Sequence, residues 1–395
     1  MKKLGFVTPW YGENIPGGAE MELRGIVTHL QDAGIALEIL TTCVKQFASD
    51  WNVNYYKEGI DYVNGIKVIR FPVRKRDVAA FDAVNYKLMN NMPITSEEEE
   101  IYEKEMINSP SLYKYMDEHK EEYSLYVFIP YMFGTTFYGA QVCLEKAVLI
   151  PCLHDESYAY MQCFKETFSK VAGMIFHAKP ESELANRIYD LSNVNNEVLG
   201  EGVYTEITFD AQRFRGKFKI EDPFIIYAGR KDKGKNVDTL LKYFREYKHR
   251  NPSDLKLVLI GGGEINIPKD CRQEIIDLGF LDLQDKYDAC AAAEFLCQPS
   301  KNESFSLVIM ESWLCSRPIL VHEDCAVTKN FAIESKGGLY FKNYYDFECC
   351  LSFYLEHKDM ASEMGENGRE YVMNNFAWDV IVDKYTKFFE QCERR

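Results

Sequence analysis

Residues 224–236 read Phe224-Ile-Ile-Tyr-Ala-Gly-Arg-Lys-Asp-Lys-Gly-Lys-Asn236, and a helical pattern follows them directly. The apolar run 224–228 is typical of a buried parallel strand, and 229–236 has the composition of a loop. Residues 237–248 are predicted to form a helix that turns Leu240, Leu241 and Phe244 inward. A strand that leads through a loop into a helix is the repeating unit of an α/β fold with a parallel sheet.

The alternation continues on both sides of this stretch. Toward the C-terminus, Asn251-Pro252 ends the helix, and further strands are predicted at 255–260, 294–297 and 318–321. Toward the N-terminus, buried strands are predicted at 4–8, 37–41, 125–129, 148–153 and 173–177. Asn64-Gly65 between two β-rich runs predicts a hairpin, and 96–122 is charged and favours helix.

A first helix is predicted after the loop 9–16. Met21, Ile26, Val27 and Leu30 are predicted to share its inner face, and Gly34 to end it.

The 395 residues favour two domains of similar α/β design. The chain turns polar and charged near 205–222, which predicts a first domain over 1–205 and a second over 206–377. A final helix from about 378 carries an apolar stripe typical of core packing. We expect the ligand site in the cleft between two such halves.

Composition excludes several classes of protein. A hydrophobic content of 46% allows a real core in each domain, and a net charge of −15 argues against a general nucleic-acid binder. The 12 cysteines form no CxxC pair and are predicted to be reduced, and many of them buried. No apolar run reaches about 20 residues, and the apolar stretch at the N-terminus is too brief for a signal peptide, so we expect a cytoplasmic protein.

Two stretches could meet an anion. Gly17-Gly18 precedes a helix, whose N-terminal N–H groups favour negative charge, although a plain tight turn would need the same glycines. Arg230 and Lys235, five positions apart in a loop that follows a strand, could both reach one diphosphate. A solvated basic loop is the alternative.

Two further stretches carry acid and imidazole groups. Glu303 and Glu311 bracket Ser-Phe-Ser-Leu-Val-Ile-Met, and Glu311 lies in an apolar helical run, where a buried carboxylate needs a partner such as a ribose diol. His154-Asp155 follows a predicted strand and could bond a sugar hydroxyl or a phosphate. An exposed helical glutamate and a structural polar pair are the respective alternatives.

In this order and at these spacings, the motifs resemble the retaining glycosyltransferases of family four, which have the GT-B fold: two Rossmann-like parallel-sheet domains facing across a cleft. The resemblance covers nearly the whole chain and is strongest over 224–322. It rests on GGAE at 17–20, GR-x4-K at 229–235, GGGE at 261–264 and ESFSLVIME at 303–311.

The resemblance implies a role for each motif. In the family, an arginine and a lysine hold the donor diphosphate, the second motif glutamate holds the ribose, and the first faces the transferred sugar. A strand-end histidine contacts the sugar near its reacting carbon. The implied catalytic residues are His154, Glu303, Arg230 and Lys235. The implied donor-binding residues are Gly17, Gly18, Arg230, Lys235, Phe280, Leu281, Phe305, Ser306, Leu307 and Glu311.

Three positions depart from the family pattern. Ser306 and Asn236 stand where the family usually has glycine, and Asn tolerates left-handed backbone. The family's Asn-Gly-Val near the domain junction appears as Gly200-Glu-Gly-Val203. We expect these changes to alter local geometry more than activity.

The implied reaction is a hexosyltransferase-type transfer from a nucleotide-diphosphate sugar to a glycan or lipid-linked acceptor, with retention, in surface polysaccharide or glycoconjugate synthesis. No two aspartates stand two apart, so the DxD metal motif is absent, and we expect neither metal nor cofactor. A nucleotide-sugar epimerase on the same fold and a non-catalytic partner subunit are the alternatives.

One basic cluster stands out in this acidic chain: Lys67, Arg70, Arg74, Lys75 and Arg76. It could meet anionic lipid or a lipid-diphosphate acceptor at the inner membrane face, which would make the protein peripheral. A solvated strand edge and loop is the alternative.

Overall fold

The computed structural model describes residues 2–394, without the side chain of Lys233. The chain divides into two compact units. The first runs to Gly202 and resumes at Ile381, and the second is Val203–Val380. The junctions follow Gly202 and Val380. The sequence predicts the corresponding boundaries after 205 and near 378.

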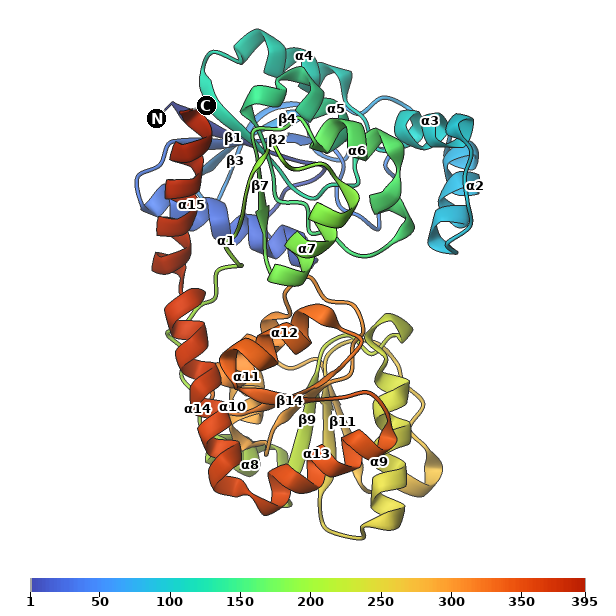
Figure 1. Ribbon diagram of the computed structural model, residues 1–395, viewed down its shortest axis with the longest axis vertical. Coiled ribbons are helices and arrows are strands. Elements are labelled where there is room, and N and C mark those ends of the chain that lie inside the picture. Colours follow the sequence, from blue (N-terminus) through green and yellow to red (C-terminus); the bar gives the residue numbers. More distant parts are fainter. Residues whose placement is uncertain (1, 395) are drawn as a thin grey trace. The chain divides into compact units, whose positions relative to one another are not determined.

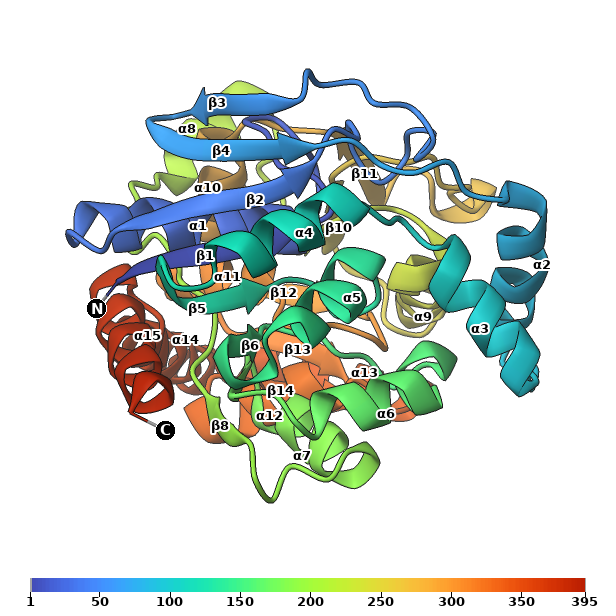
Figure 2. The same cartoon turned by 90° about the horizontal axis from the view of Figure 1, so that it is seen from above.

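The first unit is built on a mostly parallel sheet in the order β3-β4-β2-β1-β5-β6-β7-β8. Figure 2 shows β3, β4, β2, β1 and β5 side by side in that order. Only β3 runs antiparallel among the described strands, through the predicted hairpin, where Asn64 and Gly65 have φ of 51° and 79°. The strands are β1 (Lys3–Thr8), β2 (Leu37–Thr42), β3 (Gly59–Val63), β4 (Ile66–Phe71), β5 (Tyr123–Phe128), β6 (Ala147–Leu149), β7 (Gly173–Phe176) and β8 (Asn195–Val198).

Helices cover this sheet and complete its core. They are α1 (Gly18–Asp32), α2 (Val78–Met89), α3 (Ser96–Glu105), α4 (Pro110–His119), α5 (Gly134–Val142), α6 (Gln162–Phe168), α7 (Lys179–Ile188) and α15 (Trp378–Glu393). From α15, Phe388 and Cys392 lie so close to Gly173 of β7 that a Cβ there would meet them at 2.9 and 2.8 Å. The last helix of the chain is therefore part of the first unit.

The second unit has a fully parallel sheet in the order β11-β10-β9-β12-β13-β14, with α9 and α13 packed over one face (Figure 1). Its strands are β9 (Phe224–Ala228), β10 (Lys256–Ile260), β11 (Ile275–Gly279), β12 (Leu296–Gln298), β13 (Ile319–His322) and β14 (Gly338–Phe341). Its helices are α8 (Ala211–Phe218), α9 (Val237–Arg250), α10 (Leu283–Ala292), α11 (Leu307–Leu314), α12 (Ala326–Ser335), α13 (Tyr344–Glu356) and α14 (Lys358–Asn375).

Three short strands, β8, β11 and β14, are not predicted by the sequence. Each lies at the edge of its sheet, where one side has no neighbouring strand. Edge strands are less buried and carry a weaker apolar pattern. β11, for example, places Asp277 in its middle and is only partly buried.

Two details differ from the sequence prediction. β6 ends at Leu149 rather than 153, because Pro151 has no N–H to extend the ladder and Cys152 turns the chain at a φ of 53°. Met21 is 51% exposed, and Glu22 and Leu23 take the inner face of α1 in its place.

All twelve cysteines are free, and Cys43, Cys143 and Cys297 are buried. Within the described residues, no helix has the length and apolar character needed to cross a membrane.

Candidate functional site

In the second unit, loops at the carboxyl ends of three neighbouring strands are bonded to one another. The Gly229 N–H donates to the Ile260 carbonyl at 3.0 Å, the Lys231 N–H to Gly262 at 2.8 Å, and the Gly261 N–H to Gly279 at 2.7 Å. Gly261 has a φ of 121°, and a Cβ there would lie 2.0 Å from the Gly229 oxygen. Only glycine allows this approach, so Gly261 lets the loop after β10 pack directly against the basic loop 229–236.

The basic loop 229–236 holds Arg230 and Lys235 in different ways. Lys235 Nζ donates to both carboxylate oxygens of Glu303, at 2.7 and 2.8 Å. The Arg230 side chain is 76% exposed, and its nearest acidic partner is Asp232 at 3.6 Å. The Tyr227 hydroxyl donates to the Arg230 carbonyl at 2.6 Å and anchors the loop from below. One predicted cation is therefore paired, while the other remains available to a ligand.

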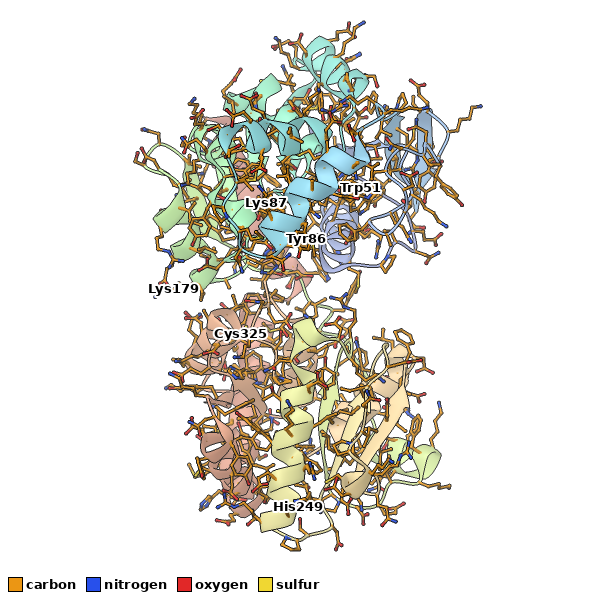
Figure 3. All side chains as sticks on the ribbon, turned by 90° about the vertical axis from the view of Figure 1, so that its right-hand side faces the viewer. Trp51, Tyr86, Lys87, Lys179, His249 and Cys325 are labelled. Carbon is orange, nitrogen blue, oxygen red and sulfur yellow. The ribbon has the colours of Figure 1, made fainter. Side chains whose placement is uncertain are left out.

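Asn236 links this loop to the end of β12. Its φ is 56°, the left-handed conformation expected where the family has glycine. Its side-chain amide donates to the Pro299 carbonyl at 3.0 Å, and α9 begins at the next residue. His249 marks the opposite, C-terminal end of that helix in Figure 3. The basic loop thus lies at the N-terminus of a 14-residue helix, whose dipole favours anions there.

The segment from Glu303 to Glu311 turns sharply into α11. Phe305 is 1% exposed and makes edge contacts with Phe331 and Phe376, which anchor the turn. Ser306 has a φ of 81°, and its side chain does not cap the helix that starts at Leu307. The first N–H groups of α11 therefore have no side-chain cap, and such a helix start is suited to bind an anion.

Glu311 lies within α11 and pairs with Lys286 of α10. Burial raises the pKa of Glu311, and the Lys286 ammonium opposes that rise. The sequence predicts a partner for this carboxylate, but sequence reasoning missed Lys286. Its one signal was a single lysine beside two aspartates in that helix.

Phe280 and Leu281 follow the left-handed Gly279 at the end of β11. The Phe280 ring is 86% exposed, so it is free to meet a planar group. Within β11, Asp277 accepts from the Gly279 N–H at 2.9 Å and from Lys231 Nζ at 2.5 Å. This buried lysine is a second residue that the sequence analysis did not single out.

The first unit holds the other predicted residues. At Gly17 a Cβ would lie 1.8 Å from a Glu20 oxygen, and Glu20 accepts from Trp10 Nε1 at 2.6 Å, so Gly17 is required by the local turn. Gly18 faces open space. His154 is half-buried, and its ring makes no hydrogen bond to residues 2–394. Asp155 instead pairs with Arg187 at 2.9 Å, so the His-Asp pair divides into a free imidazole and a structural carboxylate.

Sequence reasoning also missed a buried polar cluster in the first unit. His177 Nε2 contacts Glu22 at 2.5 Å, and its Nδ1 lies 3.3 Å from Glu181. These carboxylates raise the pKa of His177 against its burial, and burial beside Glu22 raises the pKa of Glu201. With Cys152, Glu22 and His177 have the ligand types of a metal site, but Glu22 and His177 already bond each other, and we assign no ion to them.

The predicted basic surface at 67–76 is not formed as expected. Arg70 is 2% exposed and bonds Asp61 and the Tyr11 carbonyl. Among the other members, Lys67 pairs with Glu38, Arg74 pairs with Glu105, and Arg76 lies over the Trp51 ring. Within the described residues of this cluster, only Lys75 is exposed and makes no ion pair. Most of these basic side chains make contacts inside the first unit, so few of their charges are left to contact a membrane.

Residues 208–371 match the family of group 1 glycosyl transferases. The chain is similar to the trehalose synthase of Thermococcus litoralis, with 27% identity over 180 residues that cover 42% of this chain and 43% of that protein. It thus spans less than half the length of the first curated relatives that it matches.

Solved structures resemble the chain over nearly its full length. A sucrose-phosphate synthase from Thermosynechococcus elongatus has a TM-score of 0.68 at 16% identity, covering 99% of both chains. HepE of Anabaena in complex with UDP-glucose has a TM-score of 0.65 at 14% identity, covering 99% of this chain and 100% of that one. The fold is therefore GT-B, as the resemblance predicts.

Proposed function

We propose that this chain, a group 1 glycosyltransferase with the GT-B fold, transfers a sugar from a nucleoside-diphosphate sugar to a glycan or lipid-linked acceptor. The observation that carries the proposal is the Lys235–Glu303 pair beside the uncapped start of α11. It brings a cation, a carboxylate and free helix N–H groups together within the matched region. The neighbour HepE, whose complex holds UDP-glucose, supports a donor of this class.

Each residue has a distinct proposed task. Arg230, Lys235 and the first N–H groups of α11 stabilise the charge that develops on the leaving diphosphate, the group of interactions expected to contribute most to catalysis. Glu311 holds the ribose. Glu303 releases Lys235 when the diphosphate binds and then meets the transferred sugar, which His154 also contacts.

Two finer properties belong to this proposal. The reaction retains the anomeric configuration, with the donor phosphate assisting deprotonation of the acceptor on the same face. It needs no metal, because Arg230, Lys235 and the helix N–H groups supply the positive charge that a metal ion would otherwise provide. Surface polysaccharide or glycoconjugate synthesis is the proposed setting.

A donor screen followed by transfer assays tests the function. Thermal shift with UDP-, GDP-, ADP- and dTDP-sugars identifies the donor, since a ligand at 100 times its Kd stabilises by about 2.7 kcal/mol. We expect R230A and K235A to lower turnover on the order of 10²–10³-fold, as for loss of one charge-stabilising donor. The matched control is K329A, which breaks another lysine–glutamate pair of similar exposure in the same unit.

The same assay separates the alternatives. Activity should persist in EDTA, and an activity that EDTA abolishes and Mn²⁺ restores would contradict the metal-free mechanism. Conversion of the donor without an acceptor would indicate an epimerase. Stabilisation by no donor, together with normal rates in R230A and K235A, would contradict the proposal as a whole.

A further inference from the structure

The two motif glutamates are held differently by their lysines. Lys235 occupies both oxygens of Glu303. Lys286 Nζ donates only to Oε1 of Glu311, and Oε2 receives no hydrogen bond from residues 2–394. The Lys286 and Glu311 side chains are 24% and 13% exposed. A largely buried carboxylate thus keeps one acceptor atom unused.

Helix geometry explains why Lys286 points at Glu311. Asp285 and Asp288, three positions apart on α10, bond Lys217 and Arg213 of α8. Lys286 lies between them in sequence and therefore on another face, which packs against α11. The Tyr287 carbonyl accepts from the thiol of Cys315, just after α11, at 3.6 Å, which adds a second contact between the two helices. The position of Lys286 is thus set by contacts on both sides of α10.

We propose that Lys286 is a positioning residue of the nucleotide site, which holds Glu311 ionised and turned so that Oε2 accepts from the ribose hydroxyls. This inference rests on the proposed function, which assigns the ribose to Glu311. A carboxylate can accept from both hydroxyls of a diol, whereas a 2′-deoxyribose offers one hydroxyl fewer. Lys286 thereby determines how strongly the chain prefers a ribonucleoside diphosphate to its 2′-deoxy form.

The charge on Glu311 depends chiefly on this one cation. The other titratable groups that face Glu311 have pKa values raised by burial and stay neutral near pH 7: Tyr287, Cys290 and Cys315. Two guanidiniums, those of Arg317 and Arg369, lie beside Cys315 and not beside the carboxylate. Burial already raises the pKa of Glu311, so removing the Lys286 ammonium raises that pKa further and favours the neutral carboxyl.

The test measures dissociation constants by calorimetry from pH 6 to 9. The probe is whichever of UDP, GDP and ADP binds the wild-type chain most tightly, together with its 2′-deoxy form. The variants are K286M and K286R, with E311Q and the double variant K286M/E311Q. K217M is the matched control, because it breaks a lysine–aspartate pair on the side of α10 that bonds α8. Melting temperatures establish that each variant folds, and K286Q replaces K286M if that variant does not.

We expect K286M to weaken the ribonucleotide about tenfold at pH 7, the loss expected for one hydrogen bond to a charged group. Affinity should recover as the pH rises, because the carboxyl ionises again. The preference over the 2′-deoxy form should shrink, K286R should retain most of the affinity, and K217M should bind as wild type. In the E311Q background, K286M should have no further effect.

Four results would overturn the inference. Equal affinity and pH dependence in wild type and K286M would show that Lys286 has no role in binding. A loss that is independent of pH and persists in E311Q would make Lys286 a direct ligand of the nucleotide rather than a positioning residue. If neither the three diphosphates nor dTDP binds the wild-type chain, the proposed function fails, and this inference fails with it. Binding of dTDP alone would leave the proposed function standing and overturn this inference, because dTDP has no 2′-hydroxyl for Glu311 to bind.

Discussion

Ser306 stands where the family that the chain resembles usually has glycine, and the structure shows the consequence. Its φ of 81° lies in the left-handed region, which residues with a Cβ adopt at a cost of about 1–2 kcal/mol. Its hydroxyl is buried and has no hydrogen-bond partner among the described residues. A glycine would avoid both penalties, so the serine is retained here at the expense of stability.

We therefore expect S306G to stabilise the protein by about 1 kcal/mol, measured by urea unfolding. S306A is the matched control. It removes the unpartnered hydroxyl but keeps the left-handed strain, so it should gain less than S306G. Turnover should survive in S306G, because the family usually has glycine there. A loss of stability in S306G would contradict the claim that Ser306 is strained in this conformation.

At the scale of elements, the site depends on how loops at neighbouring strand ends support one another. The loop after β10 supports the basic loop after β9 through Gly261, whose missing side chain leaves room for the Gly229 carbonyl. The position of Arg230 therefore depends on a glycine in the neighbouring loop.

We expect G261A to destabilise the second unit by about 2 kcal/mol, because its Cβ would collide with backbone at a φ that L-residues rarely adopt. Nucleoside-diphosphate affinity should fall as the basic loop is displaced. The neighbouring G262A is the control, since a Cβ there meets nothing within 4 Å. Unfolding curves and binding isotherms for the pair provide the measurement, and equal behaviour of the two variants would contradict this account.

At the scale of the whole molecule, segments far apart in sequence share one buried polar cluster in the first unit. Glu22 of α1 contacts His177 after β7, and both interact electrostatically with Glu201, near the end of the unit's first segment. Glu22 and Glu201 in turn interact with Tyr385 of α15. The cluster joins the start, middle and end of the chain, so its protonation affects the stability of the unit they build.

We expect the first unit to become less stable as the pH rises from 6 to 9. The pKa of His177 is raised above its ordinary 6.5, so its contribution is complete below that value and is lost as the pH rises through the higher folded value. The pKa of Glu201 is raised above 4.5, and it acts in the same direction, because folding favours its protonated form.

Urea unfolding across that pH range measures the effect. E201Q cannot ionise, so its stability should fall less steeply with pH than that of wild type. E183Q changes an exposed carboxylate of α7 and should follow the wild-type curve. A flat wild-type profile, or one that steepens in E201Q, would contradict the assignment.

Local signals in the sequence determined the α/β fold and most of the central strands, and they indicated the stretches that form the candidate site. Buried parallel strands need continuous apolar runs, and ligand loops need glycine and charge at their ends, so 224–236 and 303–311 could be interpreted without a structure. The left-handed turn at Asn236 could also be predicted, because asparagine is one of the few residue types that tolerate this backbone conformation.

Only the tertiary structure decided the pairings. Lys235 with Glu303, Lys286 with Glu311, and Glu22 with His177 join residues that lie 68, 25 and 155 positions apart. The buried Arg70 belongs with them, since in the sequence it reads as one charge in an exposed basic run. The sequence around a charged side chain does not reveal its partner, because the partner depends on which helices and strands pack together. Burial then fixes its charge and availability, and burial is a property of the folded chain alone.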